Sequence, residues 1–130
     1  MANADRRSID VEGLSHGNPI PVATRIGPLL VSSVVPPFDP GTRNVPDTAE
    51  AQIANLFTHV GSILEAGGAS WGDVAKMTFF VSDIRYRETI NAPWVERFPD
   101  AASRPSRHTQ LSPQSSSTPM VTCDVLAYLG

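Results

Sequence analysis

The chain has 130 residues, of which 41% are apolar and 18% are charged, a composition typical of one globular domain that spans residues 1–130. The formal net charge is −3, so no basic excess indicates a nucleic-acid partner, and a single cysteine excludes a disulfide within the chain. The three histidines lack the spacing of metal ligands, no apolar run reaches the ~20 residues that span a bilayer, and no apolar segment follows the N-terminal arginines, so we expect a cytoplasmic protein.

The first part of the chain indicates three short strands. Residues 6–13 alternate enough to form a short strand, and residues 15–21 form a loop that is rich in glycine and proline. Residues 22–27 and 28–35 are two β-rich runs joined at Gly27 and Pro28, which predict a tight turn. Residues 36–46 contain four prolines and one glycine, which favours an ordered connection over a helix or strand.

The clearest element of the sequence is a helix at about 48–66. Asp47 and Glu50 have the D-x-x-E spacing of a capping box at its start. Gly67 and Gly68 predict its end, because glycine tolerates the left-handed conformation of a helix C-terminus. Apolar residues recur at steps of three and four and define one buried face: Ile53, Leu56, Phe57, Val60, Ile63 and Leu64.

The last part of the chain indicates a strand, a helical segment and two more strands. Residues 73–83 are β-branched and aromatic on both faces, which is typical of a buried central strand. Residues 84–98 are helical in composition, but Pro93 is expected to break that helix unless Asn91 caps a new one. Residues 104–112 and 120–129 are predicted strands, and residues 113–118 a turn between them.

The predicted order of elements is β, ββ, α, β, α, ββ. Two helices can cover only one face of a six-stranded sheet, so the sequence predicts an α+β fold with its helices on one face. The other face still carries apolar side chains and needs to be covered. A second copy of the chain is the simplest cover, and we therefore expect a homo-oligomer.

At this point the sequence resembles the RidA/YjgF family, also called L-PSP. The segment "ILEAGGASWGDVAKMTFFVSDIRYRETIN" (63–91) is similar to the central signature of that family, and "RPSRHTQL" (104–111) to its "PARS" strand. The proline-rich connection at 35–46 and the terminal strand "MVTCDVLAY" (120–128) also match. The resemblance covers residues 15–129. It implies a chorismate-mutase-like fold with a six-stranded mixed sheet, a homotrimer with pockets between adjacent subunits, and hydrolysis of reactive enamines or imines without a metal or other cofactor.

The resemblance also implies two catalytic residues. Arg107 falls at the family's carboxylate-binding arginine, and the planar guanidinium matches a carboxylate with two charge-assisted hydrogen bonds. The alternative for Arg107 is an ion pair with an acidic neighbour. Asp124 falls where the family's catalytic-type glutamate lies and could orient water and relay protons, or it could belong to a structural network. Arg104 is expected at the solvated rim.

Five further residues are predicted to line the pocket by the same resemblance. Thr109 would offer its backbone and Ser33 would line the third strand. Asn91 is either a pocket residue or a helix N-cap. Ile20 replaces the family's tyrosine in the "NPIP" loop, and His16 either replaces the lost polar group or is simply solvated.

Two other residues in these strands are expected outside the pocket. His108 should point to the face opposite Arg107, because side chains alternate along a strand. Cys123 is predicted to be a core residue.

The sequence leaves the substrate open between two branches of the family. "SRPSRHT" and "NPIP" are closer to 2-aminomuconate deaminases, which act on a longer, dicarboxylic enamine, than to the aminoacrylate branch. A deaminase of a carboxylate-bearing enamine or imine is the first hypothesis. A non-catalytic carboxylate-binding or regulatory protein is the second, and an endoribonuclease or translation inhibitor is a third with little support, since no basic patch or aromatic platform is visible.

Overall fold

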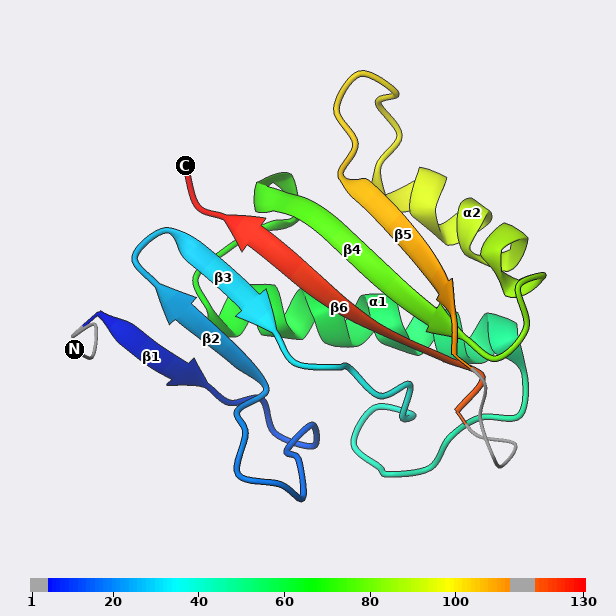
Figure 1. Ribbon diagram of the computed structural model, residues 1–130, viewed down its shortest axis with the longest axis horizontal. Coiled ribbons are helices and arrows are strands. Elements are labelled where there is room, and N and C mark those ends of the chain that lie inside the picture. Colours follow the sequence, from blue (N-terminus) through cyan, green and yellow to red (C-terminus); the bar gives the residue numbers. More distant parts are fainter. Residues whose placement is uncertain (1–4, 113–118) are drawn as a thin grey trace.

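The computed structural model describes residues 5–112 and 119–130, so the turn predicted at 113–118 lies outside the described residues. The described residues form the predicted order of strands and helices (Figure 1). The elements are β1 (Arg6–Ile9), β2 (Ala23–Ile26), β3 (Leu29–Ser32), α1 (Ala49–Ala66), the short 3-10 helix η1 (Trp71–Asp73), β4 (Val74–Val81), α2 (Tyr86–Arg97), β5 (Ser106–Leu111) and β6 (Val121–Tyr128).

The strands form one mixed sheet in the order β1-β2-β3-β6-β4-β5. Every neighbouring pair is antiparallel except β4 and β5, which run parallel. A parallel pair needs a crossover connection, and α2 supplies it between these two strands. Within the described part of the chain, neither helix has the length and apolar content that a bilayer crossing requires.

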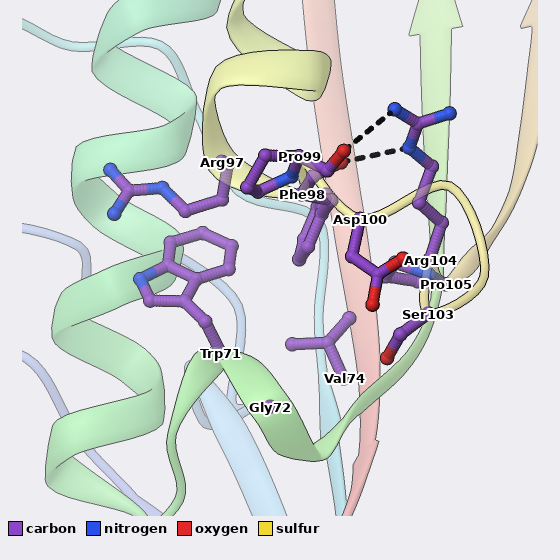
Figure 2. Close-up of a pocket in the computed structure, with 10 residues that line it drawn as sticks. All are labelled: Trp71, Gly72, Val74, Arg97, Phe98, Pro99, Asp100, Ser103, Arg104 and Pro105. Carbon is purple, nitrogen blue, oxygen red and sulfur yellow. Dashed lines mark hydrogen bonds between the residues drawn. The ribbon is translucent and has the colours of Figure 1, made fainter.

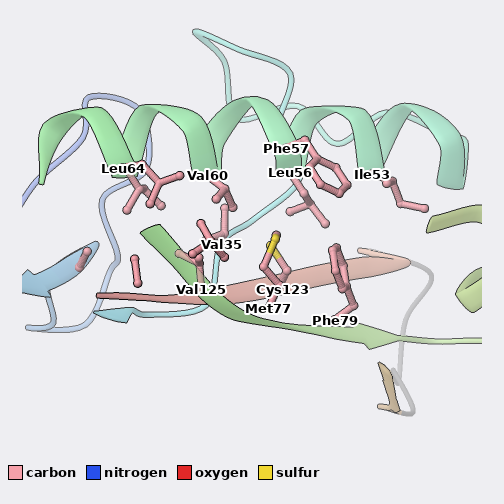
Figure 3. Packing of buried hydrophobic residues seen from close by; sticks show 14 of the residues in the cluster. Val35, Ile53, Leu56, Phe57, Val60, Leu64, Met77, Phe79, Cys123 and Val125 are labelled. Carbon is pink, nitrogen blue, oxygen red and sulfur yellow. The ribbon is translucent and has the colours of Figure 1, made fainter. Parts of the chain in front are cut away.

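Both helices cover the same face of the sheet. The side chains of Met77 and Phe79 on β4 and of Cys123 and Val125 on β6 point toward α1 and are buried beneath it (Figure 3). Cys123 is fully buried, which confirms that it is a core residue. The alternate positions of β4 and β6 face away from the helices and are half-buried or exposed: Lys76, Thr78, Phe80, Thr122, Asp124, Leu126 and Tyr128.

The start of α1 differs from the predicted capping box. The helix begins at Ala49, and its N-cap is Thr48, whose hydroxyl accepts a hydrogen bond from the Ala51 N–H at 3.2 Å. Asp47 lies one residue too early to reach the first free N–H groups of the helix, so the predicted cap was wrong by one position. Glu50 remains in the first turn, where a carboxylate favours the helix dipole.

The end of α1 is formed by the predicted glycines. Gly68 adopts a positive φ of 80°. Its N–H donates to the carbonyl of Glu65, and the N–H of Ala69 donates to the carbonyl of Leu64. This pair of hydrogen bonds is the Schellman arrangement, in which a left-handed residue is needed after the last helical turn.

Polar residues of α1 hold the proline-rich connection against the helix. The side-chain amide of Asn55 donates to the carbonyl of Pro37 at 3.2 Å and to the carboxylate of Asp39 at 2.9 Å. The ring Nε2 of buried His59 lies 2.6 Å from the carbonyl of Phe38. These contacts explain why residues 36–46 are ordered although they form neither helix nor strand.

The helix α2 is continuous through Pro93, which corrects the predicted break. Asn91 lies inside the helix and caps nothing. The helix persists beyond the proline, since the Phe98 N–H donates to the Trp94 carbonyl at 2.8 Å. A proline removes one backbone hydrogen bond, and here burial of Ile90 and Trp94 on both sides of it stabilises the helix instead.

Candidate functional site

Arg107 lies on β5 and reaches toward α2. In the parallel pairing it stands beside Met77, whose side chain faces the helices. Its Nη2 donates a hydrogen bond to Oδ1 of Asn91 at 2.8 Å. Its guanidinium carbon lies 5.2 Å from the centre of the Trp94 ring, within the range of a cation–π contact. The structure therefore brings Arg107 and Asn91 together.

The guanidinium of Arg107 has no acidic partner in the described chain. An ion pair in the described part of the chain joins Arg85 to Asp83, at 2.6 Å, and does not involve Arg107. Partial burial lowers the pKa of Arg107, and the positive charge of Arg87 lowers it further. An arginine that is half-buried, beside a second cation and without a carboxylate favours binding an anion from outside. The alternative of a structural ion pair is not observed in the described residues.

The sequence reasoning missed two residues of this cluster, Arg87 and Trp94. With Asn91 they are spaced i, i+4 and i+7, and the three therefore share one face of α2. This helical spacing was present in the sequence, but the expected break at Pro93 divided the helix that carries the three residues.

The neighbours of Arg107 on β5 alternate between the two faces. Thr109 is half-buried and pairs with Phe79, so it lies on the same side as Arg107. His108 pairs with Thr78 and is exposed on the opposite face, as predicted.

Asp124 lies on the opposite face of the sheet from Arg107. It pairs with Thr78, whereas Arg107 pairs with the adjacent Met77. Burial raises the pKa of Asp124, while the charge of Lys76 and hydrogen bonding by Thr78 oppose that rise. Within one chain, the two predicted catalytic side chains are therefore separated by the sheet itself.

The other predicted pocket residues form a second group near the start of β2 and the end of β3. The hydroxyl of Ser33 donates to the carbonyl of Pro21 at 2.8 Å, so its side chain already ties the loop to the strand. The Ile20 side chain is 48% exposed. His16 is half-buried and lines a hollow of about 280 Å³.

The hollow at His16 contains groups that sequence reasoning did not select. Arg43 lies with its guanidinium 4.9 Å from the ring centre of Phe38, and its Nη2 donates to the Ser15 carbonyl at 3.4 Å. Thr122 of β6 also lines this hollow, whereas Asp124 does not. The signal for Thr122 is its alternation along β6, two residues before Asp124.

The two groups are too far apart to form one small site in a single chain. β3 and β5 are separated in the sheet by β6 and β4. With strands ~4.8 Å apart, that places them roughly 14 Å from each other. A small ligand therefore cannot contact both groups within one chain.

Comparison with known proteins identifies a family for this chain. A family model described as endoribonuclease L-PSP matches residues 18–114, well over half of the chain. The 2-iminobutanoate/2-iminopropanoate deaminase of Escherichia coli K12 is 35% identical over 69 residues, which cover 53% of this chain and 54% of that protein. A RutC family protein of Aquifex aeolicus is 26% identical over 96 residues, covering 70% of this chain and 77% of that protein. The match thus spans about half the length of the first of these curated relatives.

Solved structures show the same fold over nearly the whole chain. The yjgF gene product of E. coli has a TM-score of 0.82 at 25% identity and covers 94% of this chain and 98% of its own. E. coli TdcF with bound serine has a TM-score of 0.84 at 22% identity, covering 95% and 99%. Yeast YEO7 reaches 0.84 at 16% identity, covering 96% and 99%. The family match and the shared fold together show that the chain belongs to the RidA/YjgF family, also called L-PSP.

Proposed function

We propose that this protein is a hydrolase that deaminates a reactive enamine or imine of a carboxylic acid, releasing ammonia and an oxo acid. The observation that carries this proposal is the state of Arg107. Its guanidinium is half-buried, stacked on Trp94, oriented by Asn91 and free of any acidic partner in the described chain. A substrate carboxylate would supply the missing negative charge through charge-assisted hydrogen bonds.

The complete site in this proposal lies between two copies of the chain, in a homotrimer like that of the family. The distance between the two groups of residues supports it. The Arg107 group (Arg107, Asn91 and Trp94) and the His16 group (His16, Ile20 and Ser33) cannot meet within one chain. The uncovered face of the sheet supports it as well, since Leu126 and Tyr128 are large apolar side chains left 38% and 59% exposed. One copy would then hold the carboxylate, and its neighbour would close the pocket.

In this proposal, a residue of the neighbouring copy orients the water that attacks the imine carbon. Asp124 keeps its proposed part in orienting that water only in the oligomer, because it cannot reach Arg107 in its own chain. His16 is the second candidate, since it lines a hollow with the hydroxyl of Thr122. Replacing Asp124 by Asn and His16 by Ala in separate variants distinguishes them, because only the residue that acts on water lowers kcat while leaving KM nearly unchanged.

The substrate we favour is a longer enamine with a second acidic group. Two features support it: the loop carries Ile20 where the family has a tyrosine, and the hollow at His16 includes the cation Arg43. A second carboxylate could be held there. A higher kcat/KM on 2-aminomuconate than on 2-aminoacrylate would support this choice, and the reverse order would overturn it.

The decisive experiment removes the carboxylate anchor. Arg107→Ala should lower kcat/KM for ammonia release from a freshly generated imino acid about 100-fold, because two charge-assisted hydrogen bonds are lost. Arg85→Ala is the matched control, since this arginine is exposed and already paired with Asp83. Turnover that survives in the Arg107 variant, with its oligomer intact, would rule out the anchoring role.

A non-catalytic carboxylate-binding protein is the second candidate. The specific observation in its favour is that Asp124 and Arg107 are not assembled in one chain. This candidate predicts that carboxylates raise the melting temperature through Arg107, while a panel of imino acids releases no ammonia above the uncatalysed rate.

A further inference from the structure

A second hollow lies at the end of α2, separate from the residues of the proposed catalytic site. It has a volume of about 310 Å³ and lies between η1, the start of β4 and the loop that joins α2 to β5. Figure 2 shows its lining: Trp71, Gly72, Val74, Arg97, Phe98, Pro99, Asp100, Ser103, Arg104 and Pro105. Neither Arg107 nor Asn91 lines it.

The floor of this hollow is aromatic and apolar. Trp71 and Phe98 meet edge to face, with ring centres 5.8 Å apart. The indole of Trp71 fits against α1 at Gly61, where an added Cβ would lie 3.6 Å from the ring, so the ring is held from behind. Phe98 is buried, and Trp71 is half-buried with part of its surface toward the hollow. Because Phe98 is almost fully buried, the exposed part of Trp71 is the rigid flat surface that this floor offers to a planar ligand.

Two cations border this floor. The guanidinium of Arg97 lies over Trp71 at 4.6 Å, a contact that fixes its position without neutralising its charge. Arg104 is exposed and lines this hollow, and backbone carbonyls hold its side chain in place. Its Nε donates to the carbonyl of Phe98 at 2.8 Å and its Nη2 to that of Pro99 at 3.4 Å. These hydrogen bonds hold the arginine in place, and the carbonyls that accept them carry no net charge.

One acidic group limits where an anion could bind. The carboxylate of Asp100 lies on the opposite side of the hollow from Arg97, near Ser103 (Figure 2). It accepts a hydrogen bond from the N–H of Ala102 at 2.9 Å, and thereby shapes the loop. Two arginines and one carboxylate give the hollow a net positive charge. The side at Arg97 is more positive than the side at Asp100.

We propose that this hollow binds a planar aromatic or conjugated carboxylate, with the acid group on Arg97 and the ring against Trp71 and Phe98. The volume suits a single-ring ligand and lies at the lower end of the range for small-molecule sites. The proposal does not depend on the proposed deaminase activity, because none of its residues belongs to the Arg107 group or the His16 group.

The two tryptophans of the chain make the proposal directly testable. Trp71 lines this hollow and Trp94 lies against Arg107, so their indole N–H signals in a proton–nitrogen NMR spectrum report the two sites separately. Trp71→Phe and Trp94→Phe assign the two signals. Titration of the full chain with benzoate should shift the Trp71 signal with a millimolar or tighter Kd, and the shift should persist in Arg107→Ala.

Matched variants test the charges. Arg97→Gln should weaken the benzoate Kd measured at Trp71 about tenfold, since one charge-assisted contact is lost. Asp100→Asn should tighten it ~2-fold or more, because a repelling charge is removed. Arg43→Gln, which also removes an arginine stacked on an aromatic ring, should leave the Kd unchanged.

The same titration has clear contrary outcomes. The proposal is overturned if benzoate shifts only the Trp94 signal, or neither signal, or if Arg97→Gln retains the wild-type Kd in a variant whose spectrum shows the native fold. Inorganic phosphate serves as the non-planar anion. If phosphate binds as tightly as benzoate, the aromatic floor contributes nothing and the assigned ligand class is wrong.

Discussion

Arg107 shows how much the meaning of a single residue depends on its neighbours. In an exposed position an arginine contributes little, and in a buried ion pair its charge is already satisfied. Here Asn91 takes one of its donors, Trp94 covers one face, and Arg87 adds a like charge. None of these contacts compensates the positive charge, which is why we propose that a substrate carboxylate binds there.

Asp124 gives the residue-scale prediction on pH. Its pKa in the folded chain is raised above the ordinary value of 3.8, mainly by burial. A raised carboxyl pKa means that ionisation opposes folding. The charged form of Asp124 therefore costs stability as the pH rises from 3.8 through the folded-state pKa, and it costs nothing at lower pH. Asp124→Asn should therefore be more stable than the wild type at pH 7, and thermal melting should show the difference vanish at acid pH.

Asp83 provides the control of opposite sign for that experiment. The side chain and backbone of Arg85 lower the pKa of Asp83, so its ionised form favours the folded state at neutral pH. Asp83→Asn should be no more stable than the wild type at pH 7. A stability gain in both variants would point to a general effect of net charge instead of the local environment of Asp124.

Cys123 gives a second prediction at this scale. Complete burial raises the pKa of its thiol, and the nearby Asp124 carboxylate adds to that effect. The thiolate is the reactive form, so the native protein should not react with iodoacetamide at pH 8, while the unfolded chain should react fully. Labelling of the native protein, followed by mass spectrometry, would contradict the packing described here.

Among the elements, α1 does more than bury an apolar face. Gln52 is fully buried, and its amide donates to the carbonyl of Pro46 at 2.8 Å. Its Oε1 accepts the backbone N–H groups of Met120 at 2.8 Å and Val121 at 3.2 Å. One side chain thus joins the helix to the proline-rich connection and to the start of β6.

Gln52→Ala should lower the free energy of unfolding by about 3 kcal/mol, because it leaves one buried and two partly buried backbone groups without this partner. Thr58→Ala is the control on the same helix, since its hydroxyl donates to the carbonyl of Ala54 in an exposed position. The control should change stability by less than about 0.5 kcal/mol. Chemical denaturation measures both, and equal effects would show that Gln52 is not a structural link.

At the scale of the whole molecule, one face of the sheet is left uncovered by both helices. The helices cover one face, whereas Leu126 and Tyr128 on the other remain exposed, with the half-buried Val31 paired to Leu126. Large apolar side chains left exposed on this face support the proposed interface between copies of the chain. The residues of the proposed site also divide into two groups that only a second copy could join.

Leu126→Asp should therefore convert the proposed homotrimer to monomers, because it places a charge in the middle of the interface. Val95→Asp, at an apolar position of α2 that is 47% exposed, lies outside this face and should leave the oligomer intact. Light scattering coupled to gel filtration gives the mass of each. A monomeric wild type would contradict both the interface and a site shared between copies.

The sequence by itself determined the order of the elements, the buried face of α1, the glycine end of that helix and the core position of Cys123. Each of these depends on local periodicity or on the conformational freedom of a neighbouring residue. Arg107 was also selected from the sequence, through its resemblance to a family strand, although nothing local shows whether an acid lies nearby.

Only the tertiary structure decided the rest. Pro93 was expected to end a helix, but the burial of Ile90 and Trp94 outweighs the one backbone hydrogen bond that proline removes. Arg107 and Asp124 are assigned to opposite faces by the pairing of β4 with both β5 and β6, a long-range register that no local pattern encodes. Local sequence sets which conformations each segment prefers, whereas contacts between distant segments set which side chains meet.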